Sequence, residues 1–83
     1  MEIIYSVSKT FTLRDKAVTV IGYVTEADDQ NYVTTILTIK SKHSDVRSYA
    51  YDNAAEAIER TDLLVRWETN MIERLQSLST EDE

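Results

Sequence analysis

The chain has 83 residues, and its 15 acidic and 9 basic side chains give a net charge of −6 at pH 7. This length allows one small domain, which buries only roughly 60% of the surface of its unfolded chain. The acidic balance argues against direct binding of nucleic acid, and no apolar stretch approaches the ~20 residues of a membrane span. The chain contains no cysteine, so packing has to stabilise it, helped at most by a second subunit.

Residues 1–52 are rich in Ile, Val and Thr, which favour β-strands. Apolar side chains alternate with Ser and Thr from Ile3 to Leu13, and we interpret the one polar interruption, Lys9, as a bulge or a bend. Turn residues separate four predicted strands, which cover residues 3–13, 18–25, 32–40 and 46–51. We therefore expect an antiparallel meander in which one face, rich in Ser and Thr, is solvated.

The C-terminal part of the chain is helical by composition. Residues 53–78 are rich in helix formers, and Asn53 followed three residues later by Glu56 gives a start that resembles a capping box. The last residues, 79–83, form an acidic tail. The predicted fold class is α+β, with one domain over residues 1–83, a four-stranded antiparallel sheet up to residue 52 and a long C-terminal helix.

The predicted helix is longer than the predicted sheet. At about 1.5 Å per residue its length is roughly 39 Å, whereas four strands of ~7 residues form a sheet of about 20 by 23 Å. The helix therefore either overhangs the sheet or breaks near Thr61, which could cap a second helix.

Apolar side chains cover an arc of about 220° around this helix, twice the ~100° stripe that packs on one surface. The residues expected to face the sheet are Ile58, Leu64, Val65, Met71, Ile72 and Leu75. Leu63, Trp67 and Leu78 remain at the margin. They either fold over the sheet edge or form a second interface, for which Trp is a favoured residue.

Glu68 lies in the middle of the apolar arc. Because an isolated buried carboxylate is unfavourable, we expect it to be paired or to lie where the helix has passed the sheet. The favoured interpretation is a glutamate on the overhang that pairs with an arginine from elsewhere. The alternatives are a catalytic carboxylate and a buried determinant of dimer register.

Candidate catalytic residues are few. The single histidine, His43, shares a predicted turn with Ser41 and Asp45, but neighbours this close cannot form a nucleophile, base and acid without distant partners. The acidic turn at 26–31 lacks the order of an EF-hand, and zinc would need several His or Cys ligands. We therefore expect no enzyme, no metal and no cofactor.

The net charge is unevenly distributed, because residues 53–83 carry eight acidic and only three basic side chains. An acidic helix suits a partner protein with a basic surface, which it would approach by electrostatic complementarity. The candidate partner-binding residues combine these acidic positions with the apolar margin: Glu56, Glu59, Asp62, Leu63, Trp67, Glu73 and Leu78. A homodimer that uses the same margin is the first alternative. A sheet-based RNA-binding module, with tyrosines that stack on bases, is the second.

In size, acidity and expected sheet-plus-helix build, the chain resembles small phage-encoded inhibitors of the anti-CRISPR and anti-restriction type. The resemblance implies a non-enzymatic inhibitor or adaptor that binds a nucleic-acid-handling protein in the host cytoplasm. The first residues have no basic segment followed by an apolar run, which likewise favours a cytoplasmic location over secretion.

Overall fold

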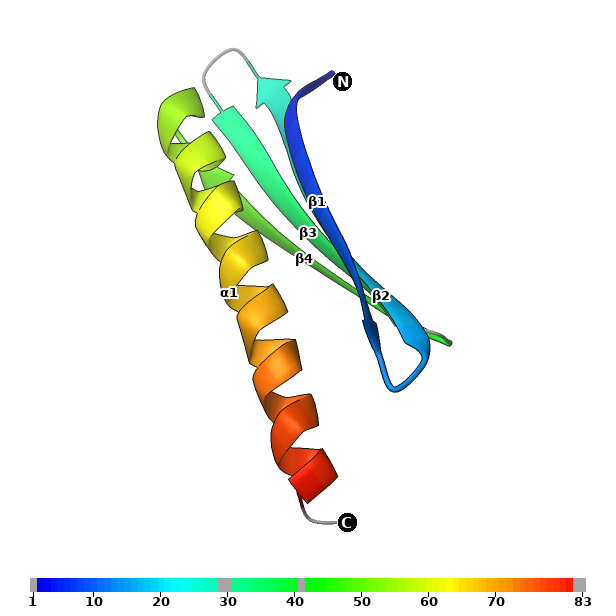
Figure 1. Cartoon of the computed structure of the whole chain (residues 1–83). Helices are drawn as coiled ribbons and strands as arrows, with labels where there is room; N and C mark the ends of the chain where they lie inside the picture. Colours follow the sequence, from blue (N-terminus) through cyan, green and yellow to red (C-terminus); the bar gives the residue numbers. More distant parts are fainter. Residues whose placement is uncertain (1, 29–30, 41, 82–83) are drawn as a thin grey trace.

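A computed structural model describes residues 2–28, 31–40 and 42–81, and within these ranges it describes the side chains of 2–27, 31–40 and 42–74. Four strands precede one helix (Figure 1): β1 (Ile3–Leu13), β2 (Lys16–Asp28), β3 (Asn31–Lys40), β4 (His43–Tyr51) and α1 (Ala54–Glu81). The strands lie in the order β1-β2-β3-β4, and each neighbouring pair is antiparallel. The predicted α+β fold, a meander followed by a C-terminal helix, is confirmed.

β1 has the predicted bounds, whereas β2, β3 and β4 are longer than predicted, and the four strands have 9 to 13 residues each. β1 and β2 are joined by a two-residue turn in which Arg14 and Asp15 have φ angles of 50° and 67°. This left-handed geometry matches the twist of a hairpin and lets the ladder continue up to the turn. Lys9 pairs regularly with Val20, so the predicted bulge at Lys9 is wrong; the register shifts between Ile3 and Tyr5 instead.

The helix is continuous past Thr61, so the alternative of a break there is wrong. Asn53 caps its start, because the Asn53 Oδ1 accepts a hydrogen bond of 3.1 Å from the backbone N–H of Glu56. The Thr61 hydroxyl donates to the carbonyl of Ala57 at 2.7 Å, which satisfies it within the helix. α1 ends at Glu81, three residues beyond the predicted boundary at residue 78, and in Figure 1 its last turns reach past the β1–β2 hairpin.

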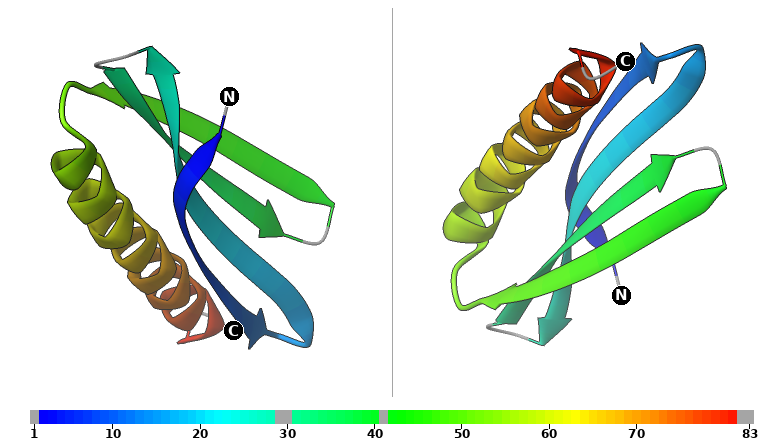
Figure 2. Two further views of the ribbon diagram at one scale, coloured as in Figure 1. Left: turned by 90° about the horizontal axis from the view of Figure 1, so that it is seen from above. Right: turned by 90° about the horizontal axis from the view of Figure 1, so that it is seen from below.

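α1 packs on one face of the sheet, which we call the covered face (Figure 2). The buried apolar core combines residues of β2 and β3 with residues of α1: Val18, Val20, Val24, Ile36, Ala57, Val65 and Ile72. Val65 and Ile72 are thus confirmed as sheet-facing residues. Ile58, Leu64 and Met71 are only half-buried, and the side chain of Leu75 lies outside the described residues.

The centre of the helix contact is made by small and polar residues, because the helix lies very close to the sheet. Gly22 in β2 faces α1, and a Cβ atom at this position would lie 2.5 Å from Val65 Cγ2 and 2.7 Å from Thr61 Cγ2. A side chain larger than hydrogen would therefore push the helix away. This close approach buries Thr61 and Thr69 where larger apolar residues were expected.

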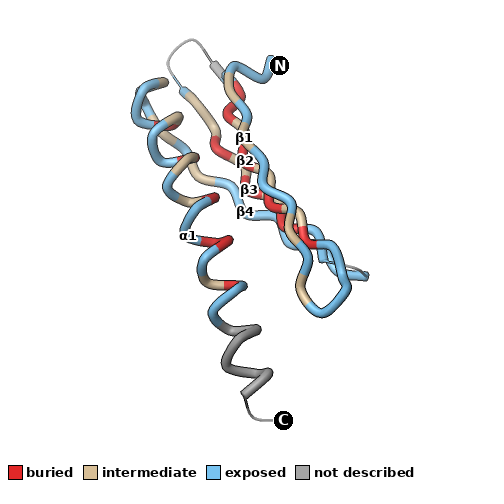
Figure 3. The backbone as a smooth tube through the Cα atoms, viewed as in Figure 1, coloured by how far each residue is buried: buried red, intermediate tan, exposed pale blue. Residues whose placement is uncertain are grey.

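The opposite face, which we call the open face, is covered by no helix of the described chain (Figure 3). The register places its residues on all four strands: Ile3, Ser6, Ser8, Thr10, Thr12, Ala17, Thr19, Ile21, Tyr23, Thr25, Val33, Thr35, Leu37, Ile39, Ser44, Val46, Ser48 and Ala50. Many are Ser or Thr, as predicted, but Ile21, Leu37 and Val46 form one row across β2, β3 and β4.

Candidate functional site

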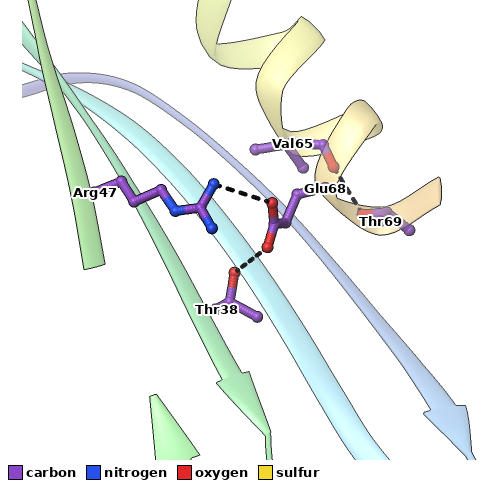
Figure 4. Close-up of polar contacts among 5 residues, drawn as sticks. All are labelled: Thr38, Arg47, Val65, Glu68 and Thr69. Carbon is purple, nitrogen blue, oxygen red and sulfur yellow. Dashed lines mark hydrogen bonds and ion pairs between the residues drawn. The ribbon is translucent and has the colours of Figure 1, made fainter. Parts of the chain in front are cut away.

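Glu68 projects from α1 toward β3 and β4 and is 8% exposed (Figure 4). Its Oε2 lies 3.8 Å from Arg47 Nη1 of β4, and its Oε1 accepts a hydrogen bond of 3.5 Å from the Thr38 hydroxyl of β3. The predicted pairing with an arginine from another element is confirmed. The predicted place on an overhang is wrong, because Glu68 lies between α1 and the sheet, beside Thr38 and Arg47.

A groove lies between β4 and α1, and Arg47 of this ion pair is one of its lining residues. The groove has a volume of about 850 Å³. Its walls are formed by side chains of both elements: Arg47, Tyr49, Tyr51, Glu56, Arg60, Leu63, Leu64, Arg66, Trp67 and Asn70. We refer to this space as the β4–α1 groove.

The groove exists because α1 covers the sheet unevenly. The helix packs chiefly on β2 and β3, and β4 is the strand that it covers least. Tyr49 and Tyr51 therefore stay half-buried although they lie on the covered face. On the opposite wall Trp67 is 54% exposed and Leu63 is 44% exposed. Apolar side chains of this size at the edge of a groove are available to a partner.

The charges of the groove are mostly positive, in contrast to the net charge of the chain. Arg47, Arg60 and Arg66 line it, against Glu56 and the buried Glu68 beneath Arg47. Guanidinium groups donate in a planar fork to carboxylate or carbonyl oxygens. The groove therefore suits an apolar side chain flanked by oxygen acceptors.

The predicted partner-binding residues do not lie together on one surface. Glu56, Leu63 and Trp67 line the β4–α1 groove. Asp62 lies on the other side of α1, where it accepts a hydrogen bond from the hydroxyl of Tyr5 in β1.

Two further acidic candidates, Glu59 and Glu73, are exposed, and the side chain of the last candidate, Leu78, lies outside the described residues.

The hydrogen bond to Asp62 raises the pKa of Tyr5 above its usual 10.0, because a donor bonded to a carboxylate holds its proton more tightly. Partial burial and the negative charge of Asp62 act in the same direction. This side of α1 is therefore tied to β1, whereas the side facing β4 is open.

The contribution of β4 to the groove was not predicted from the sequence. Arg47, Tyr49 and Tyr51 alternate along one strand and so share a face. That alternation was available in the sequence. It did not reveal that this face lies beside Trp67, because the pairing of a strand with a distant helix is not encoded in local spacing.

The two other candidates, His43 and the acidic turn, which the sequence did not favour as sites, can also be located. His43 opens β4 and lines a small hollow of about 310 Å³ with Leu13, Lys16 and Ile72 among its neighbours. No group of three or more His, Cys, Asp or Glu side chains in the described residues lies close enough to hold a metal ion. Of the acidic turn, residues 29–30 lie outside the described residues.

The register places Tyr23 on the open face and the other four strand tyrosines, Tyr5, Tyr32, Tyr49 and Tyr51, on the covered face, where α1 packs. No helix in the described part of the chain is long and apolar enough to cross a membrane. Comparisons with protein-family models, with curated proteins and with solved structures found no match to this chain.

Proposed function

We propose that the protein is a non-enzymatic interaction module, an inhibitor or adaptor, whose protein partner docks on the side of α1 that faces the β4–α1 groove. The observation that carries this proposal is the exposure of Trp67 and Leu63 at the rim of that groove. Tryptophan is the residue most enriched among those that dominate binding energy. Because Trp67 projects from a continuous helix, little backbone order has to be gained on binding.

The surrounding charges suggest how the partner is built. Glu56 and the exposed Glu59 and Glu73 support a partner with a basic surface, as the acidity of the helix suggested. Arg47 and Arg60 line the groove, so the partner segment that enters it has to present oxygen acceptors among the partner's own basic groups. With the resemblance to phage-encoded inhibitors, this supports a nucleic-acid-handling protein of the host cytoplasm as the target.

Affinity capture from a cell lysate, followed by titration of the purified captured protein, tests the proposal. Trp67→Ala should weaken binding at least about 30-fold, the loss of a ~2 kcal/mol hot-spot residue. The matched control is Ile3→Ala, because Ile3 is 61% exposed but lies on β1, outside the groove. Equal binding by the folded Trp67→Ala variant would overturn the proposal.

A salt series and two charge variants determine the sign of the partner surface. Glu59→Lys with Glu73→Lys should weaken binding to a basic partner and reduce its dependence on ionic strength. The same change in affinity from Arg60→Glu, with no effect of the first pair, would show that the partner is acidic and would contradict the basic-surface part of the proposal.

A further inference from the structure

The open face differs from the covered face of the sheet, because none of its residues named above carries a charge. This holds for the positions named above on all four strands, and the charged Asp28 pairs with Asn31 beyond them, at the end of β2. The charged residues of these strands, such as Lys9, Asp45 and Arg47, belong to the covered face. In a chain that is 29% charged, such a face is unusual.

The centre of this face is apolar and accessible. Ile21, Leu37 and Val46 stand directly opposite one another across three strands, and Ile39 lies beside this row on β3. Val46 is 62% exposed and Ile39 is 41% exposed. Ser and Thr residues surround the row, so that the patch has an apolar centre and an uncharged polar rim, the arrangement of a protein interface.

We propose that the open face is the interface of a symmetric homodimer, in which two sheets pack face to face and both helices lie on the outside. A second copy is favoured because each copy carries a charge of −6. Two such molecules repel each other wherever their negatively charged surfaces meet. On the open face they can meet without bringing like charges together. In a dimer with two-fold symmetry, the apolar row of one copy also packs against the same row of the other copy.

The same composition disfavours other occupants. Nucleic acid and anionic membranes are held by Lys and Arg, and this face provides neither. An unrelated protein would have to bring an apolar, uncharged surface of matching twist, which the second copy presents by symmetry. Packed antiparallel sheets adopt this arrangement, with inner faces ~10 Å apart.

The size of the face is adequate for a dimer. Four strands about 4.8 Å apart, with about eight residues of each rising 3.3 Å, cover roughly 19 by 26 Å, or about 500 Å² in projection. The relief of the side chains adds to this area. A standard interface buries about 800 Å² of accessible surface per partner, which this face can approach.

The small core supports the same inference independently. The largest fully buried side chains are valines and threonines: Val20, Val24, Val65, Thr34 and Thr61. No aromatic or leucine side chain is among the buried core residues of the described chain. A chain of this size with so little buried apolar volume gains stability by covering its second apolar face.

The oligomeric state of the full chain tests the proposal by light scattering and sedimentation over a concentration series. The wild type should have twice the mass of the 9.6 kDa chain. Val46→Lys, which places one charge from each copy in the interface, should raise the dimer dissociation constant at least about 100-fold. Because Val46 is exposed on an edge strand, far-ultraviolet circular dichroism should be unchanged, and Val46→Thr should remain a dimer.

Leu63→Lys is the matched control, because it places the same charge on an exposed apolar residue of α1. It should leave the dimer intact. A wild type that stays at 9.6 kDa up to millimolar concentration would overturn the proposal. So would a dimer that survives Val46→Lys or is dissociated by Leu63→Lys, since the interface would then lie on the helix. Partner binding through Trp67 is measured separately and can fail or succeed in either case.

Discussion

The two faces of the sheet differ in a way that their exposure alone would not suggest. The covered face contains the charged strand residues and a polar helix contact, yet it forms the core. The open face contains no charge and a row of Ile21, Leu37 and Val46, yet no element of the described chain covers it. Polar groups are buried where the chain itself provides their partners, and apolar groups are left exposed where it provides none.

On the covered face, three polar contacts between the strands and α1 satisfy buried or half-buried polar side chains. Thr34 of β3 meets Thr61 at 3.0 Å in the centre, Arg47 of β4 meets Glu68 at one side, and Tyr5 of β1 meets Asp62 at the other. Each joins a strand to α1, so together they fix the helix across the sheet. The open face has no second layer that would provide such contacts. Substitutions at matched positions of the two faces should therefore change the free energy of unfolding by different amounts or in different directions. Four comparisons follow, from the largest expected effect to the smallest.

Gly22→Ala should be the most destabilising small substitution, at about 2–3 kcal/mol, because the added Cβ overlaps the methyl groups of Thr61 and Val65. Urea denaturation followed by circular dichroism measures the loss. Adding Val65→Ala to the first variant should restore part of it. Ser8→Ala on the open face is the control and should change stability by less than about 0.5 kcal/mol. A fully stable Gly22→Ala variant would mean that the close approach is not required.

Adjacent threonines on β3 give a direct comparison of the two faces. Thr34→Val should cost about 1 kcal/mol, since the buried hydroxyl bonds the Thr61 hydroxyl and the Ala57 carbonyl. Thr35→Val, on the open face, should leave the stability of the monomer unchanged or slightly higher. Thr34→Val combined with Thr61→Val should cost less than the sum of the single changes. Equal losses at both positions would show that the buried contact contributes nothing specific.

Replacing Arg47 and replacing Glu68 should lower the stability of the fold by different amounts. Arg47→Ala leaves the Glu68 carboxylate buried with only Thr38 as a partner, and we expect a loss of about 1 kcal/mol, limited because Arg47 is half exposed. Glu68→Gln removes the buried charge and should cost about half as much or less. The control for Arg47 is Ser48→Ala, because Ser48 follows Arg47 in β4 and its side chain lies on the open face. Chemical denaturation of all three variants measures the order, and a larger loss for Glu68→Gln than for Arg47→Ala would contradict this account.

The smallest effect concerns pH. The raised pKa of Tyr5 means that the folded state keeps the phenolic proton at pH values where the unfolded chain has lost it. This contribution to stability is complete below pH 10.0 and is lost as the pH rises above that value. Wild type should therefore lose more stability than Tyr5→Phe on alkaline titration, and tyrosinate absorbance should show one delayed ionisation in the wild type. Tyr23→Phe, on the open face, is the control, and identical alkaline profiles of wild type and Tyr5→Phe would exclude the linkage.

Local pattern predicted most of the architecture. The period-2 alternation of the first half placed four strands in the meander, and Asn53 with Glu56 placed the start of the helix within one residue. Strand lengths were underestimated because turn residues such as Asp28 and His43 were assigned to loops, although they continue the ladders.

For the candidate site, the sequence provided Trp67, Leu63 and Glu56 on one side of the helix, and the structure added the β4 wall. The contact of Asp62 with β1 could not be predicted from the sequence, because its hydrogen bond to Tyr5 joins residues 57 positions apart.

The sequence by itself determined which residues share a face and where the charge lies, because alternation along a strand and rotation along a helix follow from backbone geometry alone. Only the tertiary structure decided which face the helix covers. Both faces of β3 carry apolar residues, Ile36 on one and Leu37 on the other, so pattern cannot choose between them. The choice depends on contacts between distant residues, above all the space at Gly22 and the partners of Thr61 and Glu68.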